Sequence, residues 1–143
     1  MQTDTNYEKD FYGWSQKQAG LLRSGNLKEA DIEHIAEEIE SMGKGEKREL
    51  VSRLTILLMH LLKWDHQPSR RSKSWYFTIL EQRRKIQRHM EDNPSLKAKL
   101  DEVLADAYNY ALLKAMAETG LEEGTFSSKC PYEYDEIMEK ELQ

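Results

Sequence analysis

The sequence contains a single cysteine, Cys130, among its 143 residues. One cysteine cannot form an intrachain disulfide, which excludes the class of small secreted proteins held together by disulfide bonds. The N-terminal residues also lack the basic and apolar regions of a secretory signal. Both features are typical of a protein of the reducing cytoplasm, and this is the location that we expect.

Long hydrophobic runs and catalytic motifs are absent as well. The longest apolar run, residues 54–62, is interrupted by Thr55 and His60 and is far shorter than the roughly 20 residues of a membrane span. No glycine-rich phosphate loop, HExxH motif or G-x-S-x-G motif occurs. We therefore assign no catalytic residue, cofactor, metal site or small-molecule ligand, and we expect no membrane partner.

Charge is distributed unevenly, although the net charge is only -5. Residues 1–43 carry 4 basic and 9 acidic side chains, residues 44–90 carry 12 and 4, and residues 91–143 carry 5 and 13. Such a chain either binds an anionic partner through its basic middle or neutralises that segment with its own acidic ends. We favour neutralisation within the chain, because the ends carry enough acid to cover the middle.

Apolar residues recur with helical spacing along nearly the whole chain, and no segment shows strand alternation. The expected helices cover about residues 7–22, 32–42, 46–65, 74–92 and 96–120, with a short helix beginning near residue 131. Gly25, Gly43 and Gly120 are expected to end helices. The short connections predict an all-α, up-and-down bundle of about five main helices plus a short C-terminal helix. We expect a single domain over residues 1–143, with flexible segments at 1–5 and 121–130.

Basic residues gather where the fourth expected helix begins. A helix dipole favours negative charge at this end, so the cations need compensation. Either acidic side chains of the second helix cover them, which is the interpretation that we favour, or an anion binds to the free N–H groups. The candidate anion-binding residues are Lys63, Arg70, Arg71, Lys73 and Ser74.

Further along the same helix, Arg83 falls on the apolar face between Ile79 and Ile86. A charged group on such a face needs a partner. We therefore predict a partly buried ion pair with the second helix, whose glutamates are the nearest acids. The candidate partners are Glu37, Glu38 and Glu40.

The outer face of this helix carries an exposed basic stripe. Its members are Arg84, Lys85 and Arg88. Basic residues beside stacking aromatic rings can bind single-stranded nucleic acid. Trp75 and Tyr76 belong to the inward face, however, which leaves Phe77 as the only ring expected to be exposed. A solvated face with a Glu81–Lys85 pair is therefore the favoured interpretation.

Neither the histidines nor the cysteine forms a recognisable reactive site. His34 has glutamates on its helix face, but His60 and His66, which would complete a metal site, lie about 120° apart around their helix. Cys130 precedes Pro131 at an expected helix N-terminus, where a thiol pKa can fall. A packed cysteine is nevertheless the favoured interpretation.

A series of short segments occurs in an order that resembles the bacterial family catalogued as domain of unknown function 29. The segments are DFYGW (10–14), LLRSG (21–25), HIAEEIESMG (34–43), SRL (52–54), HLLKW (60–64), QP (67–68), RSKSW (71–75), QRRKI (82–86), NPSL (93–96), AETGL (117–121) and CPY (130–132). The resemblance extends from about Tyr7 to Leu142. It implies a small α-helical bacterial protein, and it implies neither a reaction nor catalytic residues. His34 and His66 depart from the family pattern, which further weakens a metal site.

Two classes of function remain. The favoured class is a protein-interaction or self-assembling helical module, with a protein partner or a second copy of the chain. The alternative is binding of nucleic acid or another polyanion through the basic region 63–88. An enzyme of unfamiliar type is the least favoured class.

Overall fold

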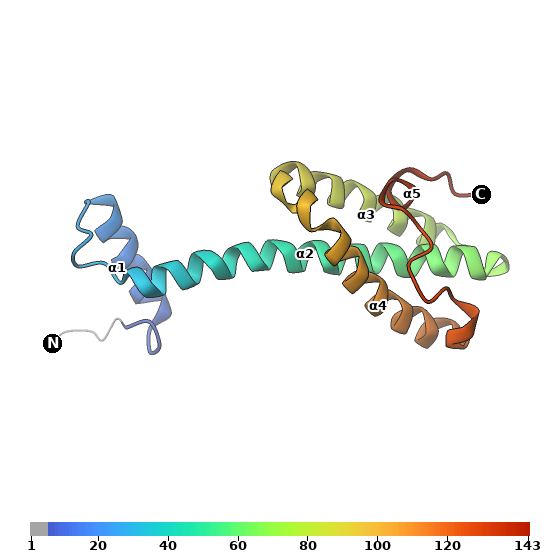
Figure 1. The fold of residues 1–143 in the computed structure, drawn as a ribbon, viewed down its shortest axis with the longest axis horizontal. Helices are drawn as coiled ribbons and strands as arrows, with labels where there is room; N and C mark the ends of the chain where they lie inside the picture. Colours follow the sequence, from blue (N-terminus) through green and yellow to red (C-terminus); the bar gives the residue numbers. More distant parts are fainter. Residues whose placement is uncertain (1–5) are drawn as a thin grey trace. The chain divides into compact units, whose positions relative to one another are not determined.

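The computed structural model describes residues 6–143, and the chain divides into two compact units, Met1–Gly45 and Glu46–Gln143. The helices are α1 (Phe11–Arg23), α2 (Ile32–His66), α3 (Lys73–Asp92), α4 (Leu100–Thr119) and α5 (Tyr134–Glu139), with 3-10 turns at Pro68–Arg70, Pro94–Lys99 and Glu123–Thr125 (Figure 1). No strand occurs within residues 6–143, and the all-α prediction is confirmed. The single-domain prediction stays a prediction, and the flexibility expected at residues 1–5 lies outside the described residues.

Helix α1 begins at a side-chain cap. The Asp10 carboxylate accepts a hydrogen bond of 2.9 Å from the Gly13 N–H, which satisfies one of the free donors of the first turn. A β-carbon on Gly13 would lie 2.3 Å from an Asp10 carboxylate oxygen, so glycine is needed for the cap to close in this way. The helix therefore begins later than the expected residue 7. After its end, Gly25 takes the left-handed conformation with φ of 75°, as a stop at this position requires.

The boundary expected at Gly43 is wrong, because α2 continues through it as one helix of 35 residues. Gly43 and Gly45 both lack the positive φ that would end a helix. Each costs about 1 kcal/mol relative to alanine, a penalty that the surrounding helix-forming residues offset. The two helices expected over 32–42 and 46–65 are therefore one, and the described chain has four long helices and the short α5.

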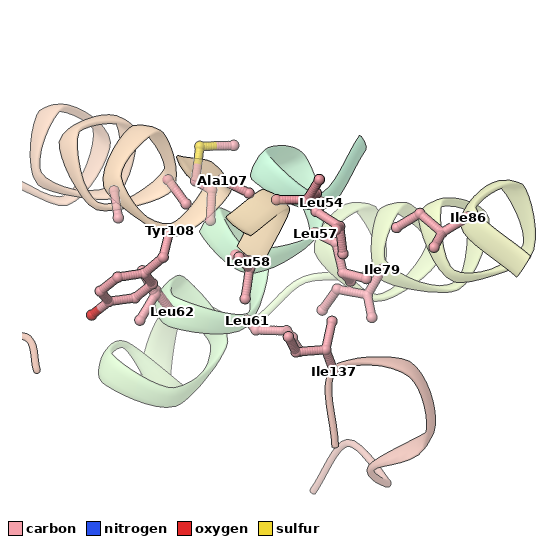
Figure 2. Packing of buried hydrophobic residues seen from close by; sticks show 14 of the residues in the cluster. Leu54, Leu57, Leu58, Leu61, Leu62, Ile79, Ile86, Ala107, Tyr108 and Ile137 are labelled. Carbon is pink, nitrogen blue, oxygen red and sulfur yellow. The ribbon is translucent and has the colours of Figure 1, made fainter. Parts of the chain in front are cut away.

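The apolar core lies in the unit formed by residues 46–143. Helix α3 runs back along the C-terminal half of α2, and α4 crosses the same half (Figure 1). Fully buried leucines of α2 meet side chains from α3, α4 and α5 in this core (Figure 2). The contributing side chains include Leu54, Leu57, Leu58, Leu62, Ile79, Ile86, Ala107, Tyr108 and Ile137. Each large apolar side chain buried in this way stabilises the fold by about 1.5–3 kcal/mol.

The segment after α4 also packs on this unit. Phe126 is buried, with its ring centroid 4.7 Å from that of His66. Helix α5 begins at Tyr134 behind a capping box of Glu133 and Glu136, and not at residue 131. Cys130 therefore precedes the helix by several residues, and burial raises the pKa of its thiol instead of lowering it. This geometry favours the packed cysteine over a reactive one.

None of the helices within residues 6–143 combines the length and the apolar character that crossing a membrane requires.

Candidate functional site

Lys63, the first of the candidate anion-binding residues, lies in the interior. Its side chain is only 8% exposed and its ammonium group is 3.1 Å from a carboxylate oxygen of Glu118 on α4. The same group lies over the Trp75 ring, 4.8 Å from its centroid. The lysine charge is therefore compensated by an acid of the chain and by an aromatic face.

Arg71 is held by backbone oxygens and a second aromatic ring. Its Nε donates to the Trp64 carbonyl oxygen at 2.9 Å, and its Nη1 donates to the Gln143 carbonyl oxygen. The guanidinium lies 4.7 Å from the centroid of the Trp64 ring. Of the other candidates, Arg70 and Lys73 are exposed, and their side chains make no hydrogen bond or ion pair with the described residues; Ser74 is exposed within α3. The α3 cap is Ser72, whose hydroxyl accepts from the Trp75 N–H at 3.2 Å.

Two of the three cations in the expected basic stripe are paired with acids of the same helix. Lys85 lies 2.5 Å from Glu81, which is the pair that the sequence predicts, and Arg88 lies 3.5 Å from Asp92. Arg84 is exposed and has no ion-pair partner among residues 6–143. Much of the charge of the stripe is therefore neutralised within α3.

One of the neighbouring rings is more exposed than its helical position predicts. Phe77 is 60% exposed, as expected, but Tyr76 is 38% exposed and not buried. The rings of Tyr76 and Phe77 form an edge-to-face pair with centroids 5.3 Å apart.

Arg83 has a different set of partners from the one that the sequence predicts. Its Nε donates to the Ile137 carbonyl oxygen at 2.8 Å, and its Nη2 donates to the Lys140 carbonyl oxygen at 2.9 Å. The candidate partners Glu37, Glu38 and Glu40 belong to the N-terminal unit. The sequence predicts that their helix ends at Gly43, whereas α2 continues through Gly43 as one helix. The guanidinium does find partners on this face, but they are carbonyl groups of the C-terminal segment.

A polar cleft of about 460 Å³ lies between α2 and α3. It is lined by Glu46, Glu49, Arg53, Lys85, Arg88, His89, Asp92 and Asn93. Glu46, Glu49 and His89 each offer one ligand atom, and these atoms lie within 4.8 Å of one another. We call these three residues the Glu–Glu–His cluster. Its members are the side chains in the described chain that could hold a metal ion.

The hydrogen bonds of the cluster fix its orientation. His89 is only 8% exposed, and its Nε2 is 2.8 Å from the main-chain carbonyl oxygen of Glu46. Its Nδ1 is 3.3 Å from Oε2 of Glu49. The other oxygen of Glu49, Oε1, accepts from Arg53 at 2.8 Å. The cleft thus holds an imidazole and a carboxylate side by side, each supported by a further group.

A family comparison matches nearly the whole chain. The family described as "Domain of unknown function DUF29" matches over residues 6–142. The chain belongs to this family. No curated protein and no solved structure matches it. The family agrees with the sequence resemblance and adds no activity.

The N-terminal unit is built around a polar and aromatic network. The Tyr7 hydroxyl donates to the Glu38 carboxylate, and this bond raises the pKa of Tyr7 to about 12. The Tyr7 ring stacks on the His34 ring, with centroids 4.2 Å apart. Asp31 accepts from the Trp14 indole at 3.0 Å and lies 2.7 Å from Nδ1 of His34. The histidine that the sequence raises as a metal candidate is thus engaged with an aspartate and a tyrosine.

The electrostatics of this network follow from the same contacts. The bond to Asp31 raises the pKa of His34, and the bonds from His34 and Trp14 lower the pKa of Asp31. Each shift favours the charged form of the pair.

The N-terminal unit also has an unburied apolar face. Ile32, Ile39 and Met42 are 53%, 59% and 63% exposed, and Ile35 is half-buried. We call these four residues the α2 apolar stripe. They recur at helical spacing on one side of α2, and Asp31 and Glu38, which make two of the contacts just described, lie at the edge of this side.

Sequence reasoning missed the Glu–Glu–His cluster. His89 shares the inward face of α3 with Ile86, and Glu46 and Glu49 share one face of α2 at a spacing of three residues. These positions are a signal for a site only when the pairing of α2 with α3 and its register are known. The sequence analysis considered His34, His60 and His66 as metal ligands, whereas the histidine that lies beside two glutamates is His89.

Proposed function

We propose that this protein is a self-associating helical interaction module, that its docking surface is the α2 apolar stripe, and that its partner is a second copy of the chain. One observation carries the proposal. Among the described residues, 7 of the 11 exposed large apolar side chains lie within residues 11–42, and all 16 members of the core cluster come from residue 50 or later. The N-terminal unit thus buries Trp14 but keeps most of its large apolar residues at the surface, which is typical of an interaction site.

The spacing of the stripe supports a second copy as the occupant. Ile32 and Ile39 are separated by one heptad, and so are Ile35 and Met42, so the four residues take the a and d positions of two heptads. A seam of this kind is self-complementary, because each knob of one helix packs into a hole formed by the same residues of another. In a two-fold symmetric dimer, both copies of the chain can therefore contribute the same surface to the interface.

The side chains around the seam are compatible with close approach. Ala36 and Gly43 occupy the flanking e positions, where small side chains let two backbones come together. The acidic residues of this part of α2 that point away from the seam are Glu33, Glu37 and Glu40. The charge of these three glutamates therefore stays at the outside of the pair, where salt screens its repulsion. Asp31 and Glu38 take the g positions beside the seam, where they accept hydrogen bonds from Trp14 and Tyr7.

The expected dimer is weak. Ile32, Ile39 and Met42 are each a little more than half exposed, so burying each contributes about 1 kcal/mol of the roughly 1.5–3 kcal/mol for a whole side chain. Six such side chains in a dimer, with the two copies of Ile35, contribute about 6–9 kcal/mol before the cost of association. An association cost of at least about 4 kcal/mol leaves at most about 5 kcal/mol, so we expect a dissociation constant above about 0.2 mM.

Sedimentation equilibrium tests the proposal over protein concentrations from about 10 μM to about 1 mM, the range in which such a constant is resolved. We expect a monomer–dimer equilibrium for the wild type. Ile39→Glu places a charge in the seam and should shift the protein to monomer. Leu113→Glu is the matched control, since Leu113 is 64% exposed on α4, and it should leave the equilibrium unchanged.

Far-UV circular dichroism establishes that both variants fold, which exposed positions are expected to permit. A wild type that stays monomeric up to 1 mM would contradict the proposal. An equal effect of Ile39→Glu and Leu113→Glu would also contradict it, because the surface of α4 would then be as important as the stripe.

Polyanion binding through region 63–88 is the second candidate, and one observation favours it. Lys73 and Arg84 are exposed and unpaired among the described residues, and they lie on the same side of α3 as the exposed ring of Phe77. Binding to a generic single-stranded oligonucleotide that weakens steeply with salt would support this candidate. Lys73→Gln and Arg84→Gln should then reduce the affinity, and Ile39→Glu should leave it unchanged.

A further inference from the structure

We propose that the Glu–Glu–His cluster is a binding site for a divalent transition metal ion such as Zn²⁺. The ligands are Nδ1 of His89, Oε2 of Glu49 and the carboxylate of Glu46. The cluster lies entirely within the unit formed by residues 46–143 and shares no residue with the α2 apolar stripe.

The tautomer of His89 is the first step of the argument. Its Nε2 lies 2.8 Å from the main-chain carbonyl oxygen of Glu46, and a carbonyl oxygen can only accept. Nε2 therefore carries the proton. In a neutral imidazole, Nδ1 then carries no proton, and its lone pair is available to bind a metal ion or a proton.

The position of Glu49 is the second step. Oε2 of Glu49 lies 3.3 Å from Nδ1 of His89, so a lone pair faces an anionic oxygen in a site where the histidine is nine-tenths buried. Two acceptors at this distance repel each other unless a cation stands between them. That cation is either a proton on Nδ1 or a metal ion bound by both atoms.

The distance and the surrounding contacts favour the metal ion. Ligands at 2.0–2.1 Å from a tetrahedral zinc are separated by about 3.3 Å, and the N···O distance here is 3.3 Å. The histidine donates its other N–H to a backbone carbonyl, which is the usual support of a metal-bound imidazole. Arg53 holds Oε1 of Glu49 and leaves Oε2 free to ligate. Each of these two ligands thus has its supporting partner in place.

The third ligand and the choice of ion follow from the donor set. Glu46 is one helical turn from Glu49, and its Oε2 lies 3.6 Å from Nε2 of His89. Its side chain is 49% exposed and free to rotate, so its carboxylate can swing to the Nδ1 side of the ring and close the site from the solvent side. One nitrogen and two carboxylate oxygens leave a fourth position for water. An imidazole ligand selects zinc or another transition metal over Mg²⁺ and Ca²⁺, which prefer oxygen.

The test is a zinc titration of the full chain after removal of metal with a chelator, in competition with a chromogenic zinc indicator. We expect one Zn²⁺ per chain and no competition from excess Mg²⁺. Glu49→Gln and His89→Gln should raise the dissociation constant more than about 10-fold. His60→Gln is the control, because His60 lies on α2 outside the cleft, and it should leave zinc binding unchanged.

Nitrogen NMR of the His89 ring gives a readout that needs no substitution and so does not depend on a variant that folds. Added Zn²⁺ should shift the Nδ1 resonance of His89 to the position of a metal-bound nitrogen while Nε2 keeps its proton. Absence of stoichiometric binding would overturn the proposal, and so would a His89 ring that stays doubly protonated in excess Zn²⁺. An equal loss of affinity in His60→Gln and His89→Gln would also overturn it, because binding would then be spread over the surface histidines.

Discussion

Arg83→Met tests how the C-terminal segment is held to the rest of its unit. The guanidinium donates to the carbonyl oxygens of Ile137 and Lys140, and Ile137 is itself fully buried in the core. Methionine keeps most of the apolar stem that the arginine packs against its neighbours. The substitution therefore removes the two hydrogen bonds and little else.

The expected loss can be worked out from these two bonds. A hydrogen bond from a charged donor contributes about 1.5–3 kcal/mol. The bond to Ile137 is partly buried and falls in this range, whereas the bond to Lys140 is exposed and contributes at most about 1 kcal/mol. We expect Arg83→Met to lower the free energy of unfolding by about 2–4 kcal/mol.

Urea unfolding followed by circular dichroism measures this difference. Arg84→Met is the matched control, because Arg84 is the exposed neighbour, and a change within about 0.5 kcal/mol is expected there. Arg83→Lys should be intermediate, since an ammonium group reaches one carbonyl more readily than two. Hydrogen exchange should show that α5 loses protection in Arg83→Met at denaturant concentrations where α2 and α3 stay protected. If Arg83→Met is as stable as the wild type, the two carbonyl contacts do not hold α5 in place and the reasoning is refuted.

Two further predictions concern the interior lysine and the N-terminal network. Lys63→Met should leave the free energy of unfolding unchanged or raise it. Glu118→Ala should lower it by about 1–3 kcal/mol, because this change leaves the buried charge of Lys63 without its acid. A loss in Lys63→Met that exceeds the loss in Glu118→Ala, measured by urea unfolding, would contradict this prediction. NMR titration should give His34 a pKa above its ordinary 6.5, and Asp31→Asn should lower it. The protonated histidine stabilises the fold fully below pH 6.5 and less as pH rises through its raised pKa, and the aspartate stabilises it above pH 3.8 and less as pH falls through its lowered pKa. The stabilisation from this pair is therefore greatest between pH 3.8 and pH 6.5. If Asp31→Asn leaves the pKa of His34 unchanged, the prediction is contradicted.

Local patterns were enough to predict much of the fold. The apolar period of residues 46–65 predicts a helix with neighbours on several sides, and α2 does place fully buried leucines against three other helices. Gly25 and Gly120 end their segments in the left-handed conformation, as expected. Gly43 shows the limit of this reasoning, because a glycine ends a helix only where the chain turns. In the middle of α2 it remains helical at a modest cost.

The candidate sites were harder to predict, since each depends on partners distant in the sequence. Arg83 is half-buried on α3, and its partners lie 54 and 57 residues further along the chain. His89 meets Glu46 and Glu49 across 43 and 40 residues, and no spacing rule joins them. Helical periodicity reports which face of a helix a residue occupies, and it carries no information about which other helix covers that face.

The sequence by itself determined that the chain is helical, that apolar residues cover a wide arc of the helix over residues 46–65, and that one face of residues 32–42 is apolar. These properties follow from the identities of residues a few positions apart, because helix formation and amphipathic faces depend on local spacing. Only the tertiary structure decided that this face stays exposed, that Lys63 is buried against Glu118, and that a histidine of α3 meets two glutamates of α2. The physical reason is that burial and contact across helices are set by packing, which the order of residues along one helix does not specify.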